Sequence, residues 1–196
     1  MTLTAAPLPA AAMARRRFAG LGASSVILTL ASQPAMANSV MCNSLSAAGS
    51  AVHSRSTTVV VCNGVSPTHY RESANWTGTG ADPNGMFNNY FSTAGVGQQL
   101  APYTLFQVIT GNFAQTSPDG VVTTPAINPD QHNVAMYVIA TWLNVLSRRV
   151  NFFTLESVMT MWSEYATTSY YVPTAGATPW DGSTLVFHLK QRMSDG

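Results

Sequence analysis

The sequence predicts a mainly α-helical protein: a single compact helical domain with a disulfide-tied, partly extended N-terminal arm. The chain has 196 residues, which is enough for one domain with a hydrophobic core. Two apolar patterns with helical spacing cover residues 134–146 and 154–165, whereas residues 57–62 are the only strong β-branched run. Helix packed on helix is therefore the expected core.

The first 37 residues contain the three parts of a secretory signal peptide. An arginine run at 15–17 is followed by an uncharged, partly apolar stretch at 19–32, and Ala35 and Ala37 are the small residues of a cleavage site. The apolar run is too short, and too interrupted by Gly and Ser, to span a bilayer. A retained membrane anchor is the less favoured alternative. We expect cleavage after Ala37 and a mature protein in the periplasm, at the cell surface or outside the cell.

The arginines resemble the twin-arginine signal of bacterial export. Arg15 and Arg16 form the pair, and Phe18 follows two positions later. A receptor reads such a pair as an address for export. An ordinary Sec signal with an arginine-rich start is the alternative, and translation begins at either Met1 or Met13. Both routes and both starts give the same expectation of export.

Low charge argues against partners that need strong electrostatic attraction. Only 9% of the residues are charged, and the formal net charge is +1. Removal of residues 1–37 takes away three arginines and leaves six basic and eight acidic residues, a net charge of −2. Because no basic stripe remains to neutralise phosphates, we expect no nucleic-acid binding.

Both cysteines, Cys42 and Cys62, lie beyond the predicted cleavage site. An oxidising compartment favours a disulfide between them. With 19 residues between the two cysteines, the chain-entropy model gives a stabilisation of about 3 kcal/mol. A two-cysteine metal site is the alternative, but further ligands at the usual spacing are missing. The disulfide would hold residues 57–62 as a strand or an extended segment.

Turn-forming residues divide the next part of the chain into short elements. One or two helical turns are predicted over residues 69–76, after a proline at the first position. A loop rich in Gly and Pro covers residues 77–85. Helical spacing predicts short helices at 86–91 and 103–109. A Ser-Pro-Asp-Gly turn within residues 111–127 predicts a hairpin or an ordered loop.

Three helices are expected in the second half of the chain. Residues 128–131 carry four start signals: an N-cap asparagine, a proline, an aspartate and a glutamine at the capping-box position. The first helix should therefore begin there. Thr154 should cap the second helix, and Asp181 or Ser183 the third. A short strand at 184–189 is the alternative to the third helix.

These predictions divide the chain into an export signal at 1–37, a disulfide-tied arm at 38–80 and a helical domain at 81–196. The stretch at 134–146 is apolar nearly all round, so its helix should be the buried centre of the domain. It is too short to cross a membrane, and we expect no membrane span after signal cleavage.

Residues 62–70, with the sequence Cys-Asn-Gly-Val-Ser-Pro-Thr-His-Tyr, and the later Trp76 resemble a motif of small exported bacterial proteins whose function is unknown. That motif reads Cys-x-Gly-x-Ser-Pro-Gly and continues with aromatic residues. The order of a buried helix, an aromatic pair at 152–153 and a Thr-initiated helix is also similar. The resemblance implies a topology and an exported location, and it implies no activity. This sequence departs from the motif at four positions: Thr68, His69, Arg71 and Glu72.

No motif of a common catalytic class is present. The four histidines are far apart in the sequence, which argues against a metal pair at helical spacing. Glu156 and Glu164 are explained more simply as surface charges than as a glycosidase pair. Asp130 and His132 are explained first as capping residues of the central helix. We expect neither a metal nor a cofactor.

One cluster has the composition needed for hydrolysis. His69, Arg71 and Glu72 place a base, a cation and an acid within four residues, and Ser66 is a nearby hydroxyl. The simpler interpretation is a solvated helical turn in which Glu72 interacts with its neighbours.

Aromatic residues in and beside a segment rich in Pro and Gly form a second candidate site. Tyr and Trp suit an exposed contact surface, and core packing is the equal alternative. The residues concerned are Tyr165, Tyr170, Tyr171 and Trp180.

The sequence favours an exported, non-enzymatic protein of the cell envelope, either a structural, surface or filament component or a binding module. The expected partners are the export machinery, and then a second copy of the chain or another envelope protein, because a low net charge opposes self-association only weakly. The alternative is a small envelope hydrolase that uses His69 with Ser66 or Glu72.

Overall fold

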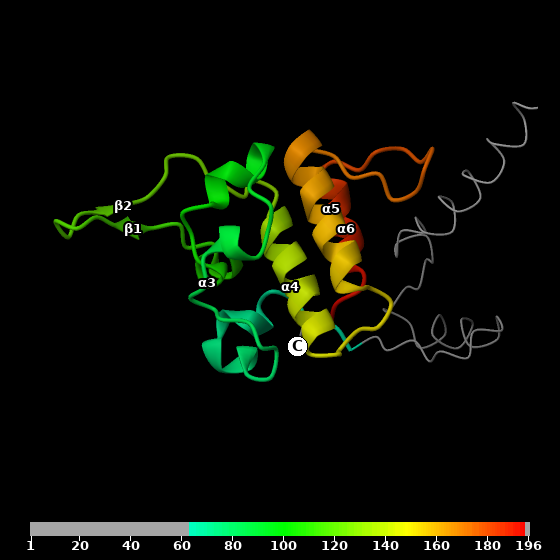
Figure 1. The fold of residues 1–196 in the computed structure, drawn as a ribbon, viewed down its shortest axis with the longest axis horizontal. Helices are drawn as coiled ribbons and strands as arrows, with labels where there is room; N and C mark the ends of the chain where they lie inside the picture. The colour runs from blue at the N-terminus through cyan, green and yellow to red at the C-terminus, as the bar shows by residue number, and fades with distance from the viewer. Residues whose placement is uncertain (1–62, 195–196) are drawn as a thin grey trace, which may run out of the picture. The chain divides into compact units, whose positions relative to one another are not determined.

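A computed structural model describes residues 63–194 (Figure 1). The predicted signal at 1–37, both cysteines and the extended run at 57–62 lie outside these residues. The signal, the disulfide and the cleavage site therefore stay predictions.

The described chain is mainly α-helical, as the sequence predicts. The short helices predicted at 69–76, 86–91 and 103–109 are also present, most of them as 3₁₀ turns. The α-helices are α3 (Leu105–Thr110), α4 (Val134–Leu146), α5 (Leu155–Thr168) and α6 (Gly182–Lys190). The 3₁₀ helices are η2 (His69–Arg71), η3 (Ser73–Trp76), η4 (Phe87–Asn89) and η5 (Gly95–Leu100).

Helix α4 is the buried centre of the described fold. Ten of its 13 residues are buried, and it packs against α3, α5 and α6. Figure 1 shows α5 and α6 on one side of α4 and α3 on the other. A helix that is apolar all round must be enclosed by other elements, so the prediction of a buried central helix is confirmed. Within residues 63–194, no helix is both long and apolar enough to cross a membrane.

The predicted start of this helix at residues 128–131 is wrong. Helical backbone begins after Asn133, which is left-handed with φ 59°. Asp130 still caps the helix, because its two carboxylate oxygens accept the amide hydrogens of Ala135 at 3.1 Å and Met136 at 2.9 Å. A loop that turns back over the helix end lets a residue several positions upstream satisfy the free amides of the first turn.

The predicted caps of the other two helices are confirmed. The Thr154 hydroxyl accepts the amide of Ser157 at 3.0 Å within a capping box. The Asp181 carboxylate accepts the amide of Thr184 at 2.8 Å. The C-terminal segment is therefore helical, and the alternative of a strand at 184–189 is wrong.

The predicted hairpin is present. Strands β1 (Gln115–Thr116) and β2 (Val122–Thr123) pair antiparallel. The turn between them is closed by the amide of Gly120, which donates to Ser117 O at 2.9 Å. Figure 1 shows the hairpin projecting from the helices. The apolar side chains of Val121 and Val122 in the hairpin, and of Ile127 in the loop that follows it, are exposed.

Residues 63–80, the described part of the predicted arm, pack into the same core as the helices. The side chains of Tyr70 and Trp76 are buried there. Asn144 of α4 fixes this segment: its Oδ1 accepts the amide of Val65 and the hydroxyl of Tyr70, each at 3.0 Å. Its Nδ2 donates to Val65 O at 2.8 Å. Ser194 pairs with Val65 in a parallel bridge, so both ends of the described chain meet near the C-terminal end of α4.

Candidate functional site

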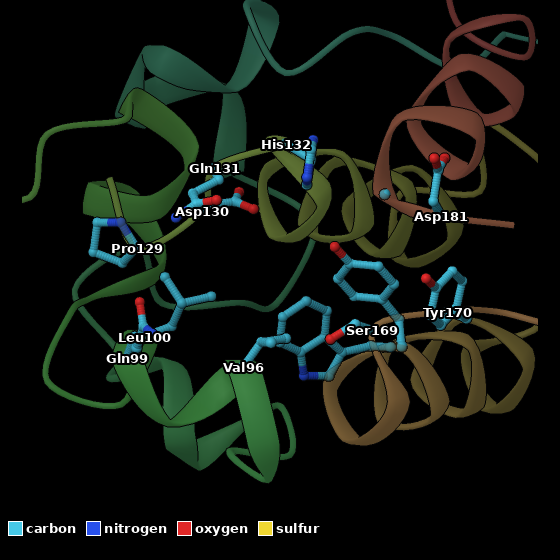
Figure 2. Close-up of a pocket in the computed structure, with 13 residues that line it drawn as sticks. Val96, Gln99, Leu100, Pro129, Asp130, Gln131, His132, Ser169, Tyr170 and Asp181 are labelled. Atoms are coloured by element: carbon cyan, nitrogen blue, oxygen red, sulfur yellow. The ribbon is translucent and has the colours of Figure 1, made fainter. Parts of the chain in front are cut away.

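A pocket of about 310 Å³ lies where the starts of α4 and α6 meet the end of α5 and helix η5 (Figure 2). Its volume is at the lower end of the range of roughly 300–1,000 Å³ typical of small-molecule sites. The loop before α4 contributes residues 129–132, and the start of α6 contributes Asp181 and Gly182. Figure 2 shows His132 and Asp181 on one side of the pocket, with Val96 and Gln99 on the opposite side.

Asp130 is the buried acid of this pocket, with 7% of its surface exposed. Burial raises the pKa of its carboxyl to about 6, although the amides of Met136, Ala135 and Val134 oppose that shift. The cause is desolvation, because removal from water disfavours the ionised form of a carboxyl group. Asp130 therefore changes its protonation within the range of environmental pH.

Tyr165 projects from α5 into the same pocket. The residue is 8% exposed, and within residues 63–194 its hydroxyl forms no hydrogen bond. Burial raises the pKa of Tyr165, and the negative charges of Asp130 and Asp181 raise it further. The hydroxyl is thus protonated, unpartnered and placed in the field of two carboxylates.

Gly182 allows these groups to come together. A Cβ atom at this position would lie 2.6 Å from the Tyr165 hydroxyl and 2.9 Å from His132 Cβ. Both contacts are closer than real Cβ atoms make. The first turn of α6 therefore reaches the pocket only because residue 182 has no side chain.

Two further polar groups lie at the rim. The Asp181 side chain is exposed, and the pKa of its carboxyl is lowered, first by the hydrogen bond from the Thr184 backbone. The imidazole Nδ1 of His132 lies 3.3 Å from Ser183 Oγ. The lining contains two carboxyl groups and neither Lys nor Arg, so its electrostatic character is acidic.

The predicted aromatic surface is divided by the fold. Tyr165 and Tyr170 line the pocket, and Tyr170 is half exposed. Tyr171 is buried, and its backbone pairs with that of Trp180 at 2.8 and 2.9 Å. Trp180 stacks on His188 with a centroid separation of 3.9 Å. A contact role thus fits the first pair, whereas the second pair serves packing.

The predicted His69 cluster lies near the C-terminal end of α4, away from the pocket. The His69 amide donates to Ser66 O at 3.1 Å within a turn. The Ser66 hydroxyl is buried and without a hydrogen-bond partner among the described residues. Burial and the charge of Arg149 lower the pKa of His69, and the carboxylate of Glu72 opposes them. In residues 63–194, no hydrogen bond joins the imidazole of His69 to Ser66 or Glu72.

The described residues contain no group of three or more His, Cys, Asp or Glu side chains that could hold a metal ion. Comparisons of the chain with protein-family models, curated proteins and solved structures find no match. Function is therefore inferred from the chain's own geometry.

Proposed function

We propose that this chain is an exported, non-enzymatic binding module of the cell envelope. The observation that carries the proposal is the pocket into which the Tyr165 hydroxyl projects without a partner. Tyr165 lines this pocket, so a polar ligand that enters can pair with its hydroxyl, which both donates and accepts hydrogen bonds. A ligand in the pocket would supply the missing partner and cover the exposed face of Tyr170.

The location belongs to the same proposal. The basic, apolar and small-residue segments of 1–37 support export and cleavage after Ala37. A disulfide between Cys42 and Cys62 would then tie the N-terminal arm. The resemblance of residues 62–70 to a motif of exported bacterial proteins supports the same location.

Two exposed aromatic side chains offer a matched test of ligand binding. Tyr170 lines the pocket, whereas Phe187 is similarly exposed on α6 but is not part of the lining. We expect a screen of small polar molecules by protein NMR to find a ligand that Phe187→Ala still binds. Tyr170→Ala should bind it several-fold more weakly. A screen without any ligand, or a ligand equally sensitive to both changes, would contradict the proposal.

The alternative of a small hydrolase has less support from the described geometry. A nucleophile must be reachable by its substrate and activated by a base, but the Ser66 hydroxyl is buried. A different histidine and serine lie within hydrogen-bond distance: Nδ1 of His132 and Oγ of Ser183 are 3.3 Å apart. Screening for ester hydrolysis with His69→Ala and His132→Ala separates the two sites, because only the variant that lacks the true base would lose turnover.

Self-assembly is a second candidate role, supported by a different observation. The projecting hairpin exposes 53% of Val121 and 63% of Val122, and Ile127 in the loop beyond it is 65% exposed. Exposed apolar residues on a short strand pair are a common place for contact with another chain. Measuring the oligomeric state in solution tests this role.

A further inference from the structure

We propose that the pocket takes a small organic cation, an amine in its protonated form, attracted by a lining that contains the Asp130 and Asp181 carboxylates and paired with the Tyr165 hydroxyl. This inference rests on the proposed binding function and specifies the ligand's chemical class.

The lining of the pocket contains acidic groups and no basic side chain that is always charged. The titratable groups that face the pocket are Asp130 and His132 from the loop before α4, Tyr165 from α5, and Asp181 before α6. None of them carries a fixed positive charge, and the lining holds no Lys or Arg. A positively charged ligand would therefore be attracted by two carboxylates, whereas an anion would be repelled by both and attracted only by the N-terminal ends of α4 and α6.

The polar groups of the pocket have free hydrogen-bond acceptor sites. Each oxygen of Asp130 accepts one backbone amide, but an ionised carboxylate has about four acceptor sites. A carboxylate buried without a cation is costly. An ammonium group offers up to three N–H donors, and carboxylate and hydroxyl oxygens of the lining can accept them.

Three aromatic side chains form part of the pocket lining. The indole of Trp162 is fixed in the core by its bond to Ser92 O at 2.7 Å and by packing on Phe87. Trp162, Tyr165 and Tyr170 all line the pocket. Aromatic rings attract organic cations and cover their alkyl parts. An organic amine therefore fits the lining better than a hydrated metal ion, which would need more oxygen ligands.

Binding by this arrangement should depend on pH in a defined direction. Protonation removes the charge of Asp130, whose pKa lies at about 6 in the ligand-free pocket. The affinity for an amine that stays protonated should be roughly tenfold lower at about pH 5 than at about pH 7.5. A neutral ligand of the same shape should lack most of this change.

The experiment compares four probes on the purified full chain by protein NMR titration: benzylamine, benzyl alcohol, benzoate and glucose. At about pH 7.5, benzylamine should bind in the pocket at least tenfold more tightly than benzyl alcohol, and benzoate should not bind. Asp181→Asn should weaken benzylamine about two- to fivefold, because asparagine keeps the helix cap but removes an exposed charge. Asp119→Asn, in the hairpin turn, should leave the affinity unchanged. Asp130→Asn is a second test of the carboxylate charge, provided that this variant keeps the wild-type circular dichroism spectrum.

The outcomes separate the two proposals. Benzylamine bound at the pocket with the expected charge dependence supports both. Tyr170-dependent binding of glucose, benzyl alcohol or benzoate, equal to or tighter than that of benzylamine, overturns the cation and keeps the binding module. Benzylamine binding that is insensitive to Asp130 and Asp181 overturns the cation site. Failure of benzylamine to bind at about pH 7.5 overturns the cation proposal, and an empty wider screen overturns the binding module as well.

Discussion

Asp130 combines two roles that oppose each other energetically. It satisfies two free amides at the start of α4, and its burial raises the pKa of its carboxyl from 3.8 to about 6. Between these two values the folded chain holds a proton that the unfolded chain has released. The contribution of Asp130 to stability is therefore greatest below about pH 4 and falls by about 3 kcal/mol as the pH rises past 6.

Replacing Asp130 by Asn should remove this pH dependence. Asparagine keeps one acceptor for the helix amides but carries no charge to desolvate. We expect the free energy of unfolding of the wild type, relative to Asp130→Asn, to fall by about 2–3 kcal/mol between about pH 4 and pH 7.5. Urea denaturation at both pH values measures this difference. Parallel profiles for the two proteins would show that Asp130 ionises normally.

Asp119→Asn is the matched control for this measurement. The Asp119 carboxyl is exposed in the hairpin turn, and the hydrogen bond from the Ser117 hydroxyl is the first cause of its lowered pKa. Its pH dependence therefore has the opposite sign, so loss of any aspartate does not mimic the effect at Asp130.

The sequence identifies Asp130 as a helix-end residue because aspartate before an apolar helix is a local signal. It does not identify Asp130 as a buried acid. Its pocket is also lined by residues of η5 and α5, which come from positions distant in the sequence. Gly182 is missed for the same reason, since its neighbours Tyr165 and His132 become visible only in the fold.

At the level of elements, local signals predict helix ends well where the cap is adjacent to the helix. Thr154 and Asp181 both cap the helices expected from the sequence. The start of α4 is missed because Asn133 turns left-handed and interrupts the helix that residues 128–131 would otherwise begin. A local pattern does not reveal such an interruption.

Thr154→Ala should destabilise the protein by about 1 kcal/mol, because the amide of Ser157 loses its acceptor and the capping box is broken. Thr160→Ala is the matched control: it is exposed within the same helix and lies away from the cap. That change should be neutral or slightly stabilising, since alanine favours a helix interior. Equal destabilisation of the two variants in urea unfolding would contradict a capping role for Thr154.

Asn144 is a polar residue that the sequence pattern hides within an apolar helix. Its side chain forms the three hydrogen bonds to Val65 and Tyr70 that attach residues 63–76 to α4. Asn144→Ala should cost about 3–5 kcal/mol, because it leaves buried backbone and hydroxyl groups unpaired. Tyr70→Phe removes one of the three bonds and should cost about 1 kcal/mol. Similar losses for the two variants in denaturant unfolding would show that Asn144 does not organise this segment.

At the level of the whole molecule, the buried central helix follows from its apolar pattern, but the pocket does not. Its walls come from residues 96–100, 129–132, 162–170 and 181–182. These segments have ordinary local explanations as turns, caps and core aromatics. Their shared site arises only from packing around α4, which a single sequence does not specify by local rules.

Export and disulfide formation make one prediction for the mature chain. The secreted protein should begin at Asn38 and have an intact mass two hydrogens lower than that of the reduced chain, because Cys42 and Cys62 pair. Mass spectrometry with and without reductant measures both properties. A chain that keeps residues 1–37 would contradict cleavage, and a mass unchanged by reduction would contradict the disulfide.

The projecting hairpin makes the prediction about assembly. An exposed strand edge with apolar side chains favours pairing with another chain, and lysine on such an edge opposes it. We expect light scattering after size-exclusion chromatography to find the wild type as an oligomer and Val122→Lys as a monomer. Phe187→Lys is the control, because it removes a comparably exposed apolar residue from α6.

A monomeric wild type would contradict assembly. An oligomer that survives Val122→Lys but is lost with Phe187→Lys would place the contact on α6. Since the pocket and the hairpin are separate in the fold, loss of assembly should leave the binding of pocket ligands unchanged.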